Sequence, residues 1–175
     1  MEVVVVGTGP GSYNGARVGI AAAQGVGVVH GCPAVGISSL EALPSVRSGS
    51  PCLALGDARR ETFFTAPLRD GRLSAAPILS EHPQFKERVR EAVEHEIALV
   101  SLDPPSRLRL PEYEILTELP TAPLLLEAWT GRSAEERREL ESLPPQPFYL
   151  REPYITLPRE GPDTGANRFK EQEKG

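Results

Sequence analysis

The chain has 175 residues, of which 39% are hydrophobic and 25% charged, values typical of one globular domain or two small lobes. Its formal net charge is -5, and its arginines alternate with glutamates. This argues against tight binding of nucleic acid by this chain alone, because such proteins usually carry a basic face. The sequence lacks a signal-peptide pattern and an apolar run of the ~20 residues that a membrane span needs. We therefore expect a cytoplasmic protein without a membrane partner.

The first 50 residues alternate strands and helices, and we expect them to form a first lobe. The run "EVVVVG" (residues 2–7) is β-branched without polar alternation, which is typical of a strand covered on both faces. A glycine-rich loop follows, then a helix predicted over residues 13–29 and a strand in "PAVGI" (residues 33–37). Ser38 and Glu41 have the spacing of a capping box, so a second helix is predicted to begin there and to end at the next proline.

The predicted helix over residues 13–29 is rich in small residues. A glycine in a helix costs up to ~1 kcal/mol relative to alanine, so several of them need compensation. Close approach of another helix is the usual one, and we predict a helix-packing surface here. The small residues are Ala16, Gly19, Ala21, Ala22, Ala23, Gly25 and Gly27.

Residues 51–157 are predicted to form a second lobe. Three strand-like runs between residues 52 and 79, joined by turns at residues 57–60 and 70–71, predict an antiparallel meander. Further elements are predicted as a helix (83–95, with Phe85, Val89 and Val93 on one face), strands (97–102 and 113–118) and helices (122–131 and 133–143). This is the order of a ribonuclease-H-like unit, so the fold class is α/β, with mixed sheets flanked by helices. The polar residues 158–175 are expected to be a disordered tail.

Four stretches together resemble one family: "GTGPGSYNGARVGIAAAQGV", "HGCPAVGISSLEAL", "DARRETFF" and "YLREPYIT". It is the bacterial TsaB (YeaZ) family of the ASKHA superfamily, and the resemblance runs in order over residues 3–155. The chain departs from the family's loop, G-P-G-S-F-T-G-L-R, at Tyr13, Asn14 and Ala16. The matching loop residues are Gly9, Pro10, Gly11, Ser12, Gly15 and Arg17.

The resemblance implies an ASKHA two-lobe fold and a role in tRNA modification. It implies a non-catalytic scaffold for a TsaD-like catalytic subunit and a TsaE-like ATPase, with tRNA reached only indirectly through the complex. Docking on the TsaD-like protein would use the glycine loop and the helix after it. The candidate partner-binding residues are Gly9, Pro10, Gly11, Ser12, Tyr13, Gly15, Arg17, Ile20, Ala23 and Gln24.

The family normally carries a meander with a D-T-S-type motif before the valine strand, and we expect the first lobe to be incomplete without it. The edge of the valine strand would then be exposed. From this we predict self-association as a dimer, a domain-swapped pairing or local disorder in residues 1–50.

Two other functions stay open at this stage. The loop has neither a G-x-G-x-x-G nor a Walker A pattern, but amides at a helix N-terminus favour anions, so a small ATP-binding or ATP-hydrolysing ASKHA enzyme is the alternative. Asp57, Arg59 and Arg60 are its nucleotide candidates, or else they form a structural turn. A peptidase is a remote third, since no G-x-S-x-G or H-E-x-x-H is present. No cofactor or metal site is predicted, and the spacing of Cys32 and Cys52 fits neither a redox pair nor zinc.

Overall fold

The valine run forms β1 (Val4–Gly7) in a computed structural model that describes residues 1–150. β1 pairs in parallel with β2 (Ala34–Ile37), with Val4 opposite Ala34, and α1 (Tyr13–His30) makes the crossover that parallel strands need. Contrary to the prediction of a fully covered strand, the side chains of β1 are half-buried. The reason is that β2 is its sole strand partner within residues 1–150.

α1 turns three residues toward this sheet: Ile20, Ala23 and Gly27 are buried. A Cβ atom at Gly27 would lie 2.7 Å from the backbone oxygen of Cys32. Glycine is therefore needed where the last turns of the helix approach the connection to β2. The remaining helix surface is mostly exposed.

The predicted helix after β2 is split in two. A 3-10 turn, η1 (Ser39–Ala42), precedes the short helix α2 (Pro44–Arg47). The capping box is not formed: Ser38 Oγ accepts a hydrogen bond from Leu40 N at 3.3 Å, but Glu41 turns its carboxylate to a distant arginine. Pro44 begins α2 rather than ending a helix, because its missing N–H is no loss at the first helical position.

The second sheet has the strand order β5-β4-β3-β7-β8, with β6 also paired to β4. β3 is antiparallel to β4 and parallel to β7, so a meander is followed by parallel strands, as expected for a ribonuclease-H-like unit. The predicted third strand of the meander is divided into β5 and β6. The strands are β3 (Cys52–Asp57), β4 (Thr62–Arg69), β5 (Arg72–Leu73), β6 (Ile78–Glu81), β7 (Ala98–Ser101) and β8 (Leu116–Thr117).

Helices cover both faces of this sheet. Alternating side chains of a strand point to opposite faces. Ala54 and Phe64 therefore pack with Leu40, Leu43 and Val46 of the η1–α2 segment. Leu55 and Phe63 pack on the other face with Phe85 and Val89 of α3 (His82–Glu94), beside the short α4 (Pro105–Leu108). Val93 was predicted to share a face with Phe85 and Val89, but it is exposed, and Ala92 is buried with them instead.

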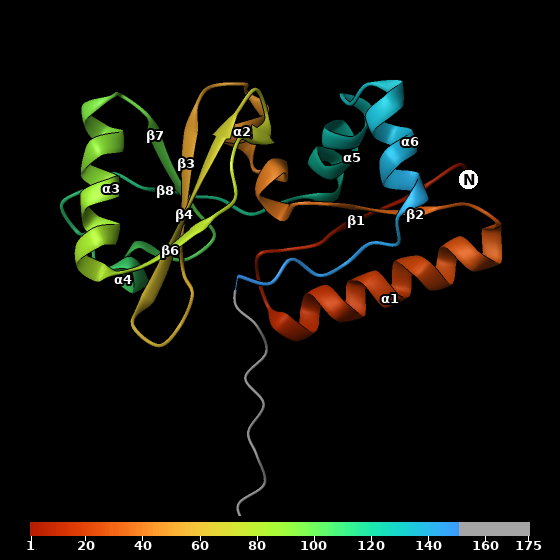
Figure 1. Cartoon of the computed structure of the whole chain (residues 1–175), viewed down its shortest axis with the longest axis horizontal. Helices are drawn as coiled ribbons and strands as arrows, with labels where there is room; N and C mark the ends of the chain where they lie inside the picture. Colours follow the sequence, from red (N-terminus) through yellow and green to blue (C-terminus); the bar gives the residue numbers. More distant parts are fainter. Residues whose placement is uncertain (151–175) are drawn as a thin grey trace, which may run out of the picture.

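α5 (Ala122–Thr130) and α6 (Ala134–Ser142) return to the first sheet, where Ala128 and Trp129 pack with Val35 and Ile37. Figure 1 shows β1 and β2 between α1 on one side and α5 and α6 on the other. Residues 122–142, which belong to the predicted second lobe, thus pack on the first sheet. The division into residues 1–50 and 51–157 stays a prediction. The predicted tail, 158–175, lies outside the described residues. No helix within residues 1–150 is long and apolar enough to cross a bilayer.

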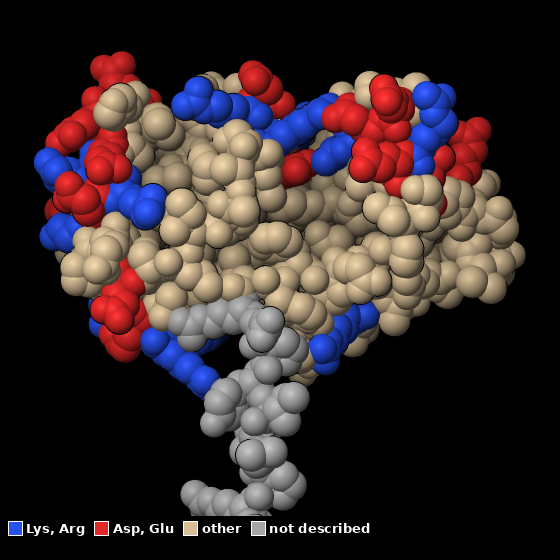
Figure 2. Space-filling model, in the orientation of Figure 1, with Lys and Arg blue, Asp and Glu red and all other residues tan. Residues whose placement is uncertain are grey.

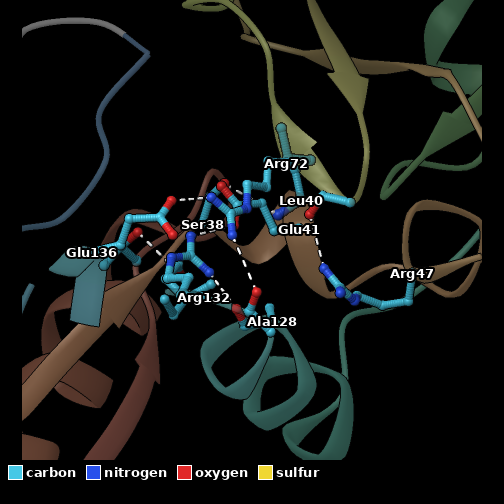
Figure 3. A network of polar contacts seen from close by, with 12 residues as sticks. Ser38, Leu40, Glu41, Arg47, Arg72, Ala128, Arg132 and Glu136 are labelled. Carbon is cyan, nitrogen blue, oxygen red and sulfur yellow. Dashed lines mark hydrogen bonds and ion pairs between the residues drawn. The ribbon is translucent and has the colours of Figure 1, made fainter. Parts of the chain in front are cut away.

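A polar network fastens the hairpin between β4 and β5 to the connection between α5 and α6 (Figure 3). Its centre is the ion pair of Glu41 and Arg132, 2.6 Å apart, whose side chains are 9% and 11% exposed. Arg72 pairs with Glu136 of α6, and Arg47 donates to the backbone oxygen of Gly71 at 2.9 Å. The network thus links the two sheets at the end of β4 opposite the turn at residues 57–61.

Candidate functional site

The glycine loop is anchored by two serines that follow β2. Gly9 N donates to Ser39 Oγ at 3.2 Å, while Ser38 Oγ and Ser39 N both donate to Gly9 O. Gly9 has a φ of +104°, a conformation that favours glycine. The "SS" of the sequence therefore holds the loop in place, a role that the capping-box interpretation missed.

An aromatic and arginine cluster lies where the loop enters α1. Ser12 caps the helix and accepts a hydrogen bond from Gly15 N at 3.3 Å. The ring of Tyr13 lies 5.0 Å from that of Tyr149, and the Arg17 guanidinium sits 3.9 Å above the Tyr13 ring. Arg17 Nε donates to the Tyr149 hydroxyl, which raises the pKa of Arg17 above its ordinary value. Tyr149 was not predicted, since 132 residues separate it from Arg17.

The predicted partner-binding residues divide into two groups. Ile20 and Ala23 are 5% and 7% exposed and face the chain's own sheet, so their side chains are not available on the surface of α1. Gly11, Gly15 and Gln24 are exposed, whereas Gly9 and Pro10 are buried, with the backbone of Phe148 next to Gly9. Tyr13 is exposed as well, and α1 also exposes valines that the prediction left out, among them Val18 and Val29.

The turn between β3 and β4 is closed by Asp57. Its Oδ1 accepts a hydrogen bond from Arg59 N at 2.7 Å, and its carboxylate pairs with the Arg59 guanidinium at 3.5 Å. Arg59, Arg60 and Glu61 all have positive φ angles, between 53° and 67°. The backbone N of Asp57 donates to Asp103 Oδ2 at 2.9 Å, so the turn is tied to the end of β7.

A cleft of about 780 Å³ brings the loop and this turn together. The two groups are far apart in sequence and were predicted separately. The cleft also takes in Asp103 and Arg107, which follow β7; the parallel pairing of β3 and β7 could have located them, because the carboxyl ends of parallel strands meet. Its polar and aromatic walls include Ser12, Tyr13, Asp57, Arg59, Arg60 and Arg107.

The histidines and cysteines of residues 1–150 lie apart from this cleft's lining. Within residues 1–150, no group of three or more His, Cys, Asp or Glu side chains is arranged to hold a metal ion. Cys32 is half-buried, Cys52 is buried, and both are free thiols. The rings of His82 and His95 contact the backbone oxygens of Arg109 and Glu91.

Comparisons with known proteins give one family model, which matches the first part of the chain, and several uncharacterized relatives. Residues 1–77 match the family model "TsaD: tRNA N6-adenosine threonylcarbamoyltransferase". ML0378 of Mycobacterium leprae, an uncharacterized protein, is 43% identical over 77 residues, which are 44% of this chain and 21% of that protein. Rv3421c of Mycobacterium tuberculosis, also uncharacterized, is 30% identical over 156 residues, which are 87% of this chain and 65% of that protein. The chain therefore spans less than two thirds of the length of either relative.

Two solved structures share the fold. One is an uncharacterized Pseudomonas aeruginosa protein with similarity to peptidase YEAZ, with a TM-score of 0.59 and 21% identity, covering 86% of this chain and 74% of that one. The other is YeaZ from Pseudomonas aeruginosa, with a TM-score of 0.52 and 18% identity, covering 78% and 69%. At these identities the likeness concerns the fold.

Proposed function

We propose that the chain is a TsaB/YeaZ-like protein and a non-catalytic scaffold for a TsaD-like protein, which its fold and the match of residues 1–77 support. In this role it supports the transfer of a threonylcarbamoyl group to the adenosine beside the tRNA anticodon, together with a TsaE-like ATPase. The match of residues 1–77 to the TsaD family supports a connection with this reaction. Both partners and the reaction itself belong to the proposal.

The observation that carries the proposal is the exposed apolar face of α1. Val18 and Val29 are 69% and 81% exposed. Single exposed apolar residues are ordinary, but a contiguous apolar patch marks an interaction site. The helix contains no acidic residue, and its basic residues, Arg17 and His30, lie near its ends. Its middle is thus uncharged and suited to burial against another protein.

The spacing along α1 suits a partner helix. Val18, Ala22, Gly25 and Val29 follow one another at intervals of three or four residues and so share a face. The two valines supply apolar area, while the small residues between them let a second helix approach closely. We assign this face, rather than Ile20 and Ala23, to the TsaD-like partner.

The serines of the glycine loop and of the segment after β2 have structural roles. Ser12, Ser38 and Ser39 use their hydroxyls to cap α1 and to hold the glycine loop. Among the hydrogen bonds of residues 1–150, none joins a histidine to a serine. A serine peptidase needs such a pair. We therefore do not propose a peptidase activity for this chain, although the description of one Pseudomonas protein mentions a peptidase.

The test is light scattering after size exclusion of the full chain with the TsaD-like protein of the same source. Val18→Asp places a charge on the proposed face, and Leu119→Asp, also at a site 69% exposed, is the matched control. We expect wild type and L119D to form a mixed complex and V18D to elute alone with an unchanged unfolding midpoint. Absence of a complex with wild type, or equal behaviour of the two variants, would overturn the proposal.

The cleft between the glycine loop and the Asp57 turn favours one second candidate, a nucleotide-dependent enzyme of the ASKHA group. Arginines line it beside the N-terminus of α1, and both features attract phosphate. A ligand that binds the native state raises its stability by mass action. A rise in the unfolding midpoint with ATP, in the absence of any partner, would favour this candidate over the scaffold.

A further inference from the structure

Arginines outnumber acidic residues in the lining of the cleft between the glycine loop and the Asp57 turn, although the chain as a whole is acidic. Three arginines and two aspartates line it, and Arg17 lies beside it against Tyr13. Figure 2 shows charged side chains at the left, along the upper edge and at the upper right of this face, with an uncharged middle and blue side chains at the lower edge. The net charge of -5 therefore does not describe the local charge of the cleft.

Each of the two aspartates binds a backbone N–H with one carboxylate oxygen and pairs with an arginine through the other. Asp57 accepts a hydrogen bond from the backbone of Arg59, and Asp103 accepts one from the backbone of Asp57. Arg59 and Arg107 pair with these carboxylates at 3.5 and 3.2 Å, yet their side chains are 70% and 50% exposed. Since a guanidinium has five N–H donors, each arginine keeps donors for an anionic ligand.

Aromatic rings accompany the arginines on the opposite wall. Tyr13 and Tyr149 line the cleft, with their rings 5.0 Å apart and tilted by 32°. Arg17 lies over the Tyr13 ring. Arginines that reach phosphates, combined with aromatic rings on which unpaired bases stack, are the usual means of binding single-stranded nucleic acid.

We propose that this cleft binds single-stranded RNA, with backbone phosphates at Arg59, Arg60 and Arg107 and a base against Tyr13. The inference rests on the proposed function, because an unpaired segment of the substrate tRNA is the RNA that such a complex would present. The net charge keeps the affinity of the isolated chain low, at a Kd on the order of 10⁻⁴ M, typical of non-specific binding. The contact therefore supplements the complex and does not replace it.

The test is fluorescence anisotropy of a labelled single-stranded RNA decamer titrated with the full chain at several salt concentrations. Arg59→Gln/Arg60→Gln removes two charges from the cleft. Arg137→Gln/Arg138→Gln removes two from α6 and is the matched control. We expect the cleft variant to weaken binding at least about 10-fold and to lower the slope of log K against log salt by about 1.4, or 0.7 per lost contact. The control variant should match wild type.

Stacking is tested separately from charge. Tyr13→Leu should weaken RNA binding about 5-fold or more, whereas Tyr13→Phe, which keeps the ring, should not. Circular dichroism melting checks that each variant is folded. Absence of RNA binding by wild type, equal losses in the two arginine variants, or displacement of the RNA by AMP or ATP at equal concentration would overturn the proposal.

The two proposals fail in different ways. If the chain co-elutes with the TsaD-like protein but does not bind RNA, the RNA site is contradicted and the scaffold proposal is not. A chain that binds RNA through the cleft but forms no mixed complex supports the RNA site and contradicts the scaffold.

Discussion

Replacing Glu41 by glutamine should destabilise the protein strongly, because it breaks the buried ion pair between the two sheets. Glu41 Oε2 lies 2.6 Å from Arg132 Nη2, and both side chains are about nine-tenths buried. The amide keeps the shape of the carboxylate but leaves the Arg132 charge with a neutral partner. Removing one member of a buried pair costs about 3–5 kcal/mol. For a chain of this size, the thermal midpoint should fall by roughly 6–20 °C.

Urea unfolding followed by circular dichroism measures this effect. Glu87→Gln is the control, because its pair with Arg90 on α3 is about half exposed and should leave the midpoint unchanged. Replacing both members, as in Glu41→Gln/Arg132→Met, should recover most of the loss, since no unpaired charge remains. Equal midpoints for E41Q and E87Q would refute the view that this pair holds the two sheets together.

Two further predictions concern the backbone and pH. Gly9→Ala should lower the free energy of unfolding by about 1–3 kcal/mol, because Gly9 has a φ of +104° and the new Cβ would lie 3.3 Å from Phe148 O. Gly25→Ala has open space around the new Cβ and should raise the free energy of unfolding by up to about 1 kcal/mol. Equal effects of the two variants in urea titrations would contradict this prediction. Hydrogen bonds from Ser133, with help from Arg72, lower the pKa of Glu136 to about 2. A carboxyl whose pKa is depressed on folding contributes stability above its unfolded pKa, near 4.3, and loses it as pH falls toward 2. The difference in thermal midpoint between wild type and Glu136→Gln should therefore shrink from pH 6 to pH 2, and a constant difference would count against the assignment.

Local patterns were enough to predict most elements of the fold. The valine run, the small-residue helix and the Asp70–Gly71 hairpin turn all form near their predicted bounds, because each depends on neighbours along the chain. The helix expected from Ser38 failed for a distant reason. Glu41, its intended capping partner, is held by Arg132, which is 91 residues away.

The candidate site shows the same limit. The loop and the Asp57 turn are recognisable in the sequence, but their meeting in one cleft depends on how the two sheets pack. No local pattern indicates that the Tyr149 hydroxyl will accept a hydrogen bond from Arg17. Ile20 and Ala23 turn inward because α1 packs on β1 and β2, which leaves Val18 and Val29 exposed on the outer side of α1, where we propose that the partner docks.

Hydrogen–deuterium exchange of the chain with and without the TsaD-like protein tests the central proposal most directly. We predict slower exchange in peptides from α1 when the partner is present, with exchange in α3 unchanged. The exposed apolar face of α1 would then be covered in the complex. Unchanged exchange across α1, or protection confined to α3 or α6, would contradict docking through this helix.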